Sequence, residues 1–181
     1  DSLEDEYSID ASRIYVAGFS NGGFMAYKLA CQLSERIAAV AAVSGVMSNS
    51  VASSCQPLHP TPVLHIHGTE DPAIPAEGIG PDLLPSVDET LDYWIGFNQC
   101  RKKKVADLPD EDLDDGSTVE RITHTDCANS SDVIFYKVIH GGHSWPGAPV
   151  SVYPGLNRDF NASLAIWDFF SNHQLPTAGP D

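Results

Sequence analysis

The stretch R13-I-Y-V-A-G-F-S-N-G-G-F24 decides the fold class of this chain. Residues 13–17 are mostly apolar, with β-branched and aromatic side chains, which is typical of a buried strand. Residues 21–35 place apolar side chains at helical spacing. Gly18-Phe19-Ser20-Asn21-Gly22 lies between the two segments. The sequence therefore predicts a strand that turns sharply into a helix, with a serine in the turn.

The rest of the chain continues this alternation of short apolar runs and amphipathic segments. Further strands are predicted at residues 37–43, 62–67 and 133–139, and further helices at residues 86–99 and 159–172. The strands are apolar on both faces, which is the pattern of a parallel sheet covered by helices on both sides. The expected fold is therefore α/β, with a mostly parallel sheet of about four strands.

Four long loops are expected to connect these elements. They are predicted at residues 46–61, 72–85, 101–132 and 144–158.

The composition is that of a single globular domain, which we place at residues 1–181. Hydrophobic residues make up 42% of the chain and charged residues 19%, so a sizeable core is possible. No apolar run is long enough to cross a bilayer. The chain begins Asp-Ser-Leu-Glu, without an initiator methionine or a signal peptide, which would fit a processed or trimmed start.

The net charge argues against two classes of partner. The formal charge is −15, with only 10 Lys and Arg residues. Such a surface repels the phosphates of nucleic acids and of anionic membranes, so neither is expected as a partner. One basic cluster, residues 101–104, lies beside the acidic run at 107–115. We expect this region to be a solvated loop rather than a binding patch.

Four cysteines favour two disulfides and an oxidising compartment: Cys31, Cys55, Cys100 and Cys127. Three pairings are possible, and the sequential one closes two short loops. Each of these would stabilise the fold by about 3–4 kcal/mol. The chain contains no Cys-x-x-Cys pair, so a zinc knuckle is not supported and no metal is expected.

The Gly-x-Ser-x-Gly turn carries the first chemical signal. A serine between a strand and a helix is held in a strained conformation that exposes its hydroxyl, and small neighbours avoid clashes there. The turn also points the helix N-terminus at the reacting oxygen, so the Asn21 N–H can donate to an oxyanion. The alternative is a plain glycine-rich turn without a chemical role.

A serine hydroxyl needs a base and a group that orients the base before it can attack an ester. In this fold class the chain order is serine, acid, histidine. Ser20, Asp71 and His143 follow that order, each in a loop directly after a predicted strand. Because parallel strands bring their carboxyl ends to one edge of the sheet, these three residues are the predicted catalytic triad.

Other titratable residues are weaker candidates. Glu70 neighbours Asp71 and is the alternative acid, whereas Asp82 and Asp88 lie further from the strand end. His140 lies at the end of its strand, before the loop, which indicates a structural role.

Two further patterns have structural explanations. His65 and His67 alternate on one strand and so share a face, but no third ligand has suitable spacing. We therefore expect a packed, hydrogen-bonded pair rather than a metal site. The run at 110–115 lacks the regular alternation of a calcium loop and is expected to be a solvated turn.

Four motifs together resemble one family. They are GFSNGGFMAYKLAC (18–31), PVLHIHGTEDPAIPAEG (62–78), SVDETLDYWIGFNQC (86–100) and GGHSWPG (141–147). They are similar to those of the polyhydroxybutyrate depolymerase and feruloyl esterase group of α/β-hydrolases, which are secreted serine esterases. The resemblance covers nearly the whole chain. It implies a secreted or periplasmic carboxylesterase for short-chain acyl esters of feruloyl, acetyl or hydroxyalkanoate type, with no cofactor.

The same resemblance implies roles for individual residues. It implies the triad Ser20, Asp71 and His143. It also implies the disulfides Cys31–Cys55 and Cys100–Cys127. Phe19 and Trp145 would line the substrate pocket, the alternative for Trp145 being a core position.

The chain departs from the family pattern before the serine turn. A complete α/β-hydrolase places early strands there, together with a loop that supplies a second oxyanion donor. We therefore expect a truncated fold, in which one edge of the strand at 13–17 is bare. A bare apolar edge is a pairing hazard, so we expect a homodimer partner or a separate N-terminal fragment to cover it. The alternative function is that of a non-catalytic hydrolase remnant that acts as a binding or assembly module.

Overall fold

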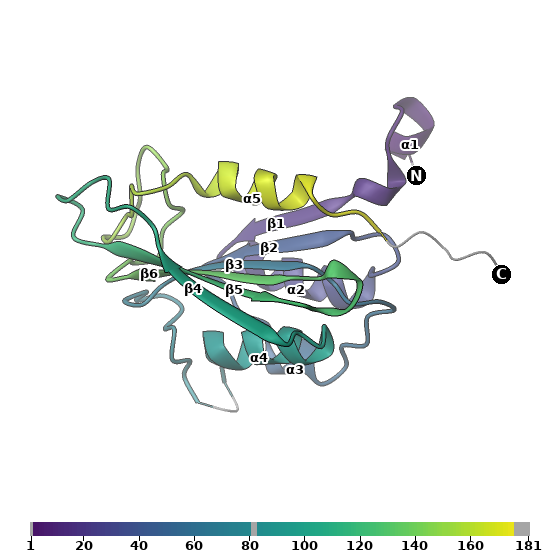
Figure 1. Cartoon of the computed structure of the whole chain (residues 1–181), viewed down its shortest axis with the longest axis horizontal. Coiled ribbons are helices and arrows are strands. Elements are labelled where there is room, and N and C mark those ends of the chain that lie inside the picture. The colour runs from purple at the N-terminus through teal and green to yellow at the C-terminus, as the bar shows by residue number, and fades with distance from the viewer. Residues whose placement is uncertain (1, 81–82, 176–181) are drawn as a thin grey trace.

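A mixed sheet organises the molecule (Figure 1). The structure, a computed structural model, describes residues 2–80 and 83–175, so Asp82 lies outside the described residues. Within these ranges the sheet has six strands in the order β1-β2-β3-β6-β5-β4. The strands are β1 (Tyr15–Phe19), β2 (Ala39–Val43), β3 (Val63–Gly68), β4 (Lys102–Asp107), β5 (Thr118–Thr125) and β6 (Val133–Ile139).

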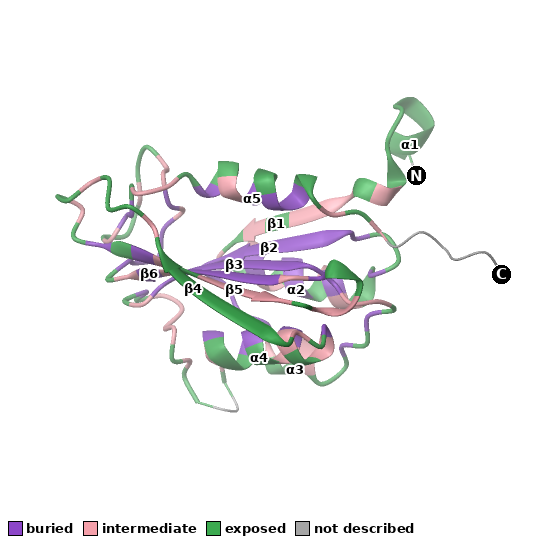
Figure 2. Ribbon diagram, in the orientation of Figure 1, coloured by how far each residue is buried: buried purple, intermediate pink, exposed green. Residues whose placement is uncertain are grey.

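The first four strands in this order are parallel, as the apolar runs predicted. Every residue of β2 and of β3 is buried, and both strands are buried along their length in Figure 2. Strands that are apolar on both faces need a covering layer on each side. The α/β prediction is therefore confirmed.

The predicted strand number is too low, because part of the expected loop at 101–132 is an antiparallel hairpin. β5 pairs with β6 and β4 pairs with β5, both in antiparallel orientation. All six residues of β4 are exposed, so its sequence, Lys-Lys-Lys-Val-Ala-Asp, shows no alternation of apolar and polar side chains. Pairing with β5 holds this edge strand in place where burial does not.

Helices cover both faces of the sheet (Figure 1). The helical segments are α1 (Ser2–Glu6), α2 (Asn21–Gln32), α3 (Asn49–Ala52), α4 (Val87–Phe97) and α5 (Ala162–Ser171), with short 3₁₀ turns η1 (Ala11–Arg13) and η2 (Ala128–Ser130). Side chains of α2 and α4 form one apolar core with the sheet, and side chains of α5 form the other. None of the helices in the described part of the chain is long and apolar enough to span a membrane.

Local signals fix where two helices begin. Ser86 accepts a hydrogen bond from the Glu89 backbone N–H, and the Glu89 carboxylate accepts one from the Ser86 backbone. This capping box starts α4 close to the predicted position. Asn161 caps α5 through the Leu164 N–H at 3.0 Å, so α5 begins at Ala162, later than the predicted residue 159.

Two disulfides join elements that are close in sequence. Cys31, on α2, is bonded to Cys55, and Cys100 is bonded to Cys127. The structure thus contains the pairing that the family resemblance implied, and two disulfides fit an oxidising compartment.

The parallel strands bring three loops together at the carboxyl end of the sheet. β1, β3 and β6 each end there, and the loop after each carries one of the predicted triad residues. Gly68 and Gly141 let the loops after β3 and β6 approach closely, because a Cβ atom on Gly68 would overlap the Gly141 carbonyl. The fold thus brings Ser20, Asp71 and His143 to the carboxyl end of the sheet.

Candidate active site

Ser20 occupies the strained turn that the sequence predicted. Its backbone has φ 53° and ψ −117°, a conformation that residues other than glycine rarely adopt. The Ser20 N–H donates to the Val43 carbonyl at 2.8 Å, and the Ser20 carbonyl accepts from Gly23 N–H at 2.9 Å. A Cβ atom on Gly18 would overlap the Gly22 backbone. The serine is therefore fixed between β1 and the first turn of α2, and Asn21 begins the helix.

Asp71 and His143 form a buried hydrogen-bonded pair. His143 Nδ1 lies 2.8 Å from Asp71 Oδ2, and the side chains are 4% and 0% exposed. The other carboxylate oxygen, Oδ1, accepts from the N–H groups of Ala73 at 2.9 Å and Ile74 at 2.8 Å. Because a carboxylate only accepts, the histidine proton lies on Nδ1 and Nε2 is left as an acceptor. This is the tautomer that a general base requires.

The alternative acid, Glu70, points elsewhere. Its carboxylate lies 2.7 Å from Nδ1 of His140, and both side chains are well exposed. His140 therefore pairs with Glu70 on the surface, while the loop after β3 aims Asp71 at His143. Asp88 lies in the first turn of α4.

The ring of His143 contacts the ring of Phe19, which belongs to the serine turn. The centroids of these two rings are 4.8 Å apart, and Phe19 directly precedes Ser20. Ser20 Oγ forms no hydrogen bond with any residue in the ranges 2–80 and 83–175. The structure thus places all three predicted residues at the carboxyl end of the sheet, and the hydrogen bond between His143 and Asp71 is formed.

Known proteins that resemble this chain are esterases. Residues 3–79 match the family model described as phospholipase/carboxylesterase. The protein named "Probable feruloyl esterase C" from Aspergillus niger is 31% identical over 94% of this chain and 54% of its own length. Feruloyl esterase C from Emericella nidulans is 29% identical over the same shares. These matches support the resemblance to feruloyl esterase-like α/β-hydrolases that the sequence motifs indicated.

Solved structures agree on the fold. An acetyl xylan esterase from Aspergillus awamori superposes with a TM-score of 0.61 at 17% identity, over 93% of this chain and 63% of that one. A thermostable esterase gives 0.54 at 16% identity, over 96% of this chain and 34% of that one. At these identities the match supports the fold alone. The chain spans about half the length of the curated feruloyl esterases that it matches.

In this feruloyl esterase-like chain, aromatic side chains surround the histidine. Tyr153 meets the His143 ring edge-on, with centroids 5.1 Å apart. Phe19 meets Trp145 in the same way at 6.5 Å, and Trp145 Nε1 donates to Ser163 Oγ at 3.1 Å. Trp145 is partly buried against the core beneath α5, which agrees with the core position that the sequence offered as the alternative; its place in a substrate pocket stays a prediction. Tyr153 was not predicted, because it lies ten residues beyond His143 in a long loop without a motif.

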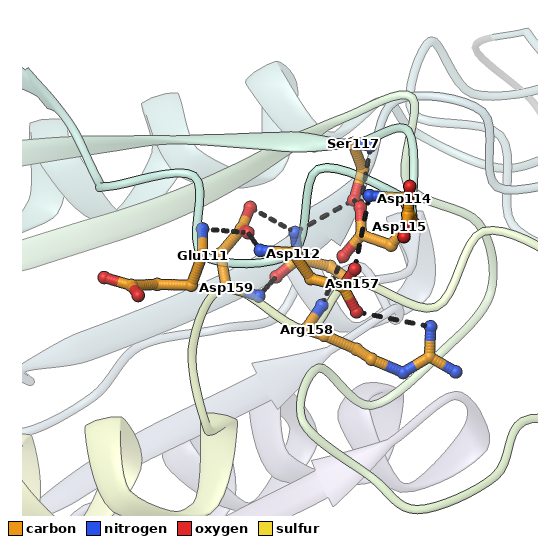
Figure 3. A network of polar contacts seen from close by, with 8 residues as sticks. All are labelled: Glu111, Asp112, Asp114, Asp115, Ser117, Asn157, Arg158 and Asp159. Atoms are coloured by element: carbon orange, nitrogen blue, oxygen red, sulfur yellow. Dashed lines mark hydrogen bonds and ion pairs between the residues drawn. The ribbon is translucent and has the colours of Figure 1, made fainter.

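A polar network joins the connection between β4 and β5 to the end of the loop that follows His143 (Figure 3). Asp159 Oδ1 accepts from the N–H groups of Glu111 at 3.0 Å and Asp112 at 3.3 Å. Buried Asn157 donates to Ser117 Oγ at 2.9 Å and to Asp159 Oδ2 at 2.8 Å. The β4–β5 connection therefore holds the end of the loop that follows His143. Much of the acidic run, expected to be solvated, serves this structural purpose.

The paired histidines on β3 are also as predicted. His65 Nε2 lies 3.2 Å from His67 Nδ1, and both rings are buried. No group of three or more potential metal-binding side chains occurs among residues 2–80 and 83–175.

Proposed function

We propose that this chain is a serine carboxylesterase that works through Ser20, His143 and Asp71. The observation that carries the proposal is the buried 2.8 Å pair of His143 and Asp71, together with a serine held at φ 53° next to Phe19, whose ring contacts that of His143. A strained serine turn and an oriented imidazole at one sheet edge are the parts that an acyl-transfer mechanism needs. The family supports the same reaction class.

The reaction follows from the tautomer of His143. Ser20 Oγ attacks the ester carbonyl carbon, and His143 Nε2 takes the hydroxyl proton. Asp71 stabilises the imidazolium that forms, and the Asn21 N–H at the start of α2 donates to the oxyanion. His143 then gives the proton to the departing alkoxide, which leaves an acyl-enzyme. Water activated by the same histidine releases the acid, and no cofactor takes part.

The substrate class follows from the relatives and the aromatic side chains. Relatives are named for feruloyl and acetylxylan ester hydrolysis, so we place feruloyl or acetyl esters first and hydroxyalkanoate esters second. Phe19, Trp145 and Tyr153 supply aromatic surface around His143, on which a planar acyl group can pack. The two disulfides support a secreted or periplasmic setting for this activity.

The test compares this chain with Ser20→Ala. We expect hydrolysis of p-nitrophenyl acetate and butyrate by the parent chain and its loss in the variant, with intact folding shown by circular dichroism. A fluorophosphonate probe should label the parent only, because it reacts with activated serines. Equal turnover in both proteins, or no turnover and no labelling in either, would contradict the proposal and favour a non-catalytic module.

A further inference from the structure

A buried chain of hydrogen bonds runs from the serine helix to the loop that carries Asp71. The Tyr27 hydroxyl lies 2.7 Å from His65 Nδ1, and His65 Nε2 lies 3.2 Å from His67 Nδ1. His67 Nε2 lies 2.8 Å from the Ile74 carbonyl. Tyr27 and the two histidines are at most 1% exposed. Three polar side chains in an apolar core need a reason, since packing alone would be served by apolar residues.

The acceptor at the end of this chain fixes the direction of its hydrogen bonds when both histidines are neutral. The Ile74 carbonyl can only accept, so His67 carries its proton on Nε2. In the neutral ring, which burial favours because it lowers the pKa of His67, Nδ1 is an acceptor, and His65 must donate from Nε2. His65 Nδ1 accepts in turn from the Tyr27 hydroxyl. The hydrogen bonds thus assign the Nε2–H tautomer to both neutral rings, and burial lowers the pKa of His65 as well.

The chain ends on the residue that also holds Asp71. The Ile74 N–H donates to Asp71 Oδ1 at 2.8 Å, while its carbonyl is held by His67. His67 Nε2 is itself 3.6 Å from Asp71 Oδ2, the oxygen that accepts from His143. His67 thus fixes the turn beside Asp71 without adding a positive charge to the carboxylate. The negative charge of Asp71 stays available to the imidazolium of His143.

We propose that Tyr27, His65 and His67 are positioning residues, which anchor the Ile74 carbonyl and thereby aim Asp71 at His143. This inference rests on the proposed function, since it assigns these residues to the same triad. They act through Asp71 and touch neither the substrate nor the reacting atoms.

The test uses two variants of His67 that differ in one hydrogen bond. Glutamine can place an N–H where His67 has Nε2, so His67→Gln keeps the bond to Ile74, whereas His67→Leu removes it. Leucine is preferred to alanine because His67 borders a cavity of about 240 Å³, from which water could replace a lost ring. Ile66→Val, a buried neighbour on the opposite face of β3, controls for general loss of packing.

Two readouts are measured on the folded chain. In the nitrogen-15 NMR spectrum of the parent, we expect the neutral Nε2–H tautomer at His65 and His67 and a low-field proton from the His143–Asp71 bond. His67→Leu should shift or lose that low-field signal, and His67→Gln and Ile66→Val should keep it. Fluorophosphonate labelling of Ser20 should slow by about ten- to a hundredfold in His67→Leu only, which is the loss seen when hydrogen-bond partners of metal-bound side chains are removed.

The outcomes separate the two proposals. An unchanged low-field signal in folded His67→Leu, or an Nδ1–H tautomer at His67, would overturn the positioning inference. If the parent is not labelled at all but the NMR results are as expected, the esterase proposal fails and the positioning of Asp71 stands.

Discussion

At the scale of single residues, the choice between two adjacent acids decides the chemistry. Asp71 is buried against His143, and Glu70 is exposed against His140. Asp71→Asn should lower kcat by about 10⁴-fold, because an amide can stabilise the wrong tautomer of the base. Ester hydrolysis measured at neutral pH checks this.

Glu70→Gln is the matched control for that prediction. It changes the neighbouring carboxylate in the same way, but an exposed ion pair contributes little. We expect kcat to stay close to that of the parent. A large loss of kcat in Glu70→Gln with none in Asp71→Asn would mean that Glu70, and not Asp71, is the acid of the triad.

The buried histidines make stability depend on pH. Burial lowers the pKa of His65 and His67 in the folded chain, whereas in the unfolded chain each titrates near pH 6.5. Below about pH 6.5 the unfolded state therefore binds protons that the native state does not. The free energy of unfolding should fall as the pH drops from about 6.5, by up to about 1.4 kcal/mol per pH unit for each histidine.

Urea unfolding between pH 4.5 and 7.5 measures this slope. His67→Gln should reduce it, because one of the two depressed groups is gone. The exposed His140→Gln should leave it close to that of the parent. An identical slope in the parent and in His67→Gln would show that His67 is not held neutral in the native state.

The sequence indicated much of the site at this scale, and the reason is local. Ser20 lies in a motif, and Asp71 and His143 follow strands, so order along the chain is enough to predict them. Tyr27 and Ile74 carry no such signal, because their contacts depend on how α2 and the acid loop pack against β3. The hydrogen bond between His65 and His67 was predictable from their spacing. The further bonds from His65 to Tyr27 and from His67 to Ile74 were not.

At the scale of elements, the loop that follows His143 depends on a buried asparagine. Asn157→Ala would remove the donor to Ser117 Oγ and Asp159 Oδ2 and the acceptor of the Asp159 N–H. We expect a loss of about 1–3 kcal/mol in the free energy of unfolding, since buried partners are left unsatisfied. Hydrogen exchange should increase at residues 110–117 and 144–158.

Asp114→Ala tests whether any change in this acidic segment has the same effect. Figure 3 shows Asp114 within the network, but it donates to Asp112 Oδ1, at 3.2 Å, from its backbone N–H. Exchange in the two loops should therefore match that of the parent. Equal increases in both variants would mean that Asn157 has no special role.

The β4–β5 hairpin shows which elements sequence patterns miss. Alternation appears where one face of a strand is buried, and β4 is exposed on both faces. Its lysines looked like part of a solvated charged loop, but they form a strand because β5 supplies the backbone partners. The buried strands had been predicted correctly because burial on both faces leaves a continuous apolar run.

At the scale of the whole molecule, the two outer edges of the sheet differ in chemistry. β4 carries three lysines and an aspartate, all exposed, which discourage pairing with another chain. β1 pairs with β2 on one side, and among the described residues no strand pairs with its other side. β1 has the sequence Tyr-Val-Ala-Gly-Phe, without a charge. The edge next to the serine turn therefore lacks the protection that the opposite edge has.

We predict that a second copy of this chain pairs along the β1 edge in solution. Light scattering at micromolar concentration should give the mass of a dimer. Ala17→Lys should shift that mass to the monomer, because Ala17 is an exposed position within β1 and a lysine there would protect the edge as the lysines of β4 do. Val105→Lys on β4, where the edge is already charged, should leave the dimer intact. A monomeric parent with nothing bound would contradict this prediction. The apolar edge of β1 would then be exposed to water without causing two copies to pair.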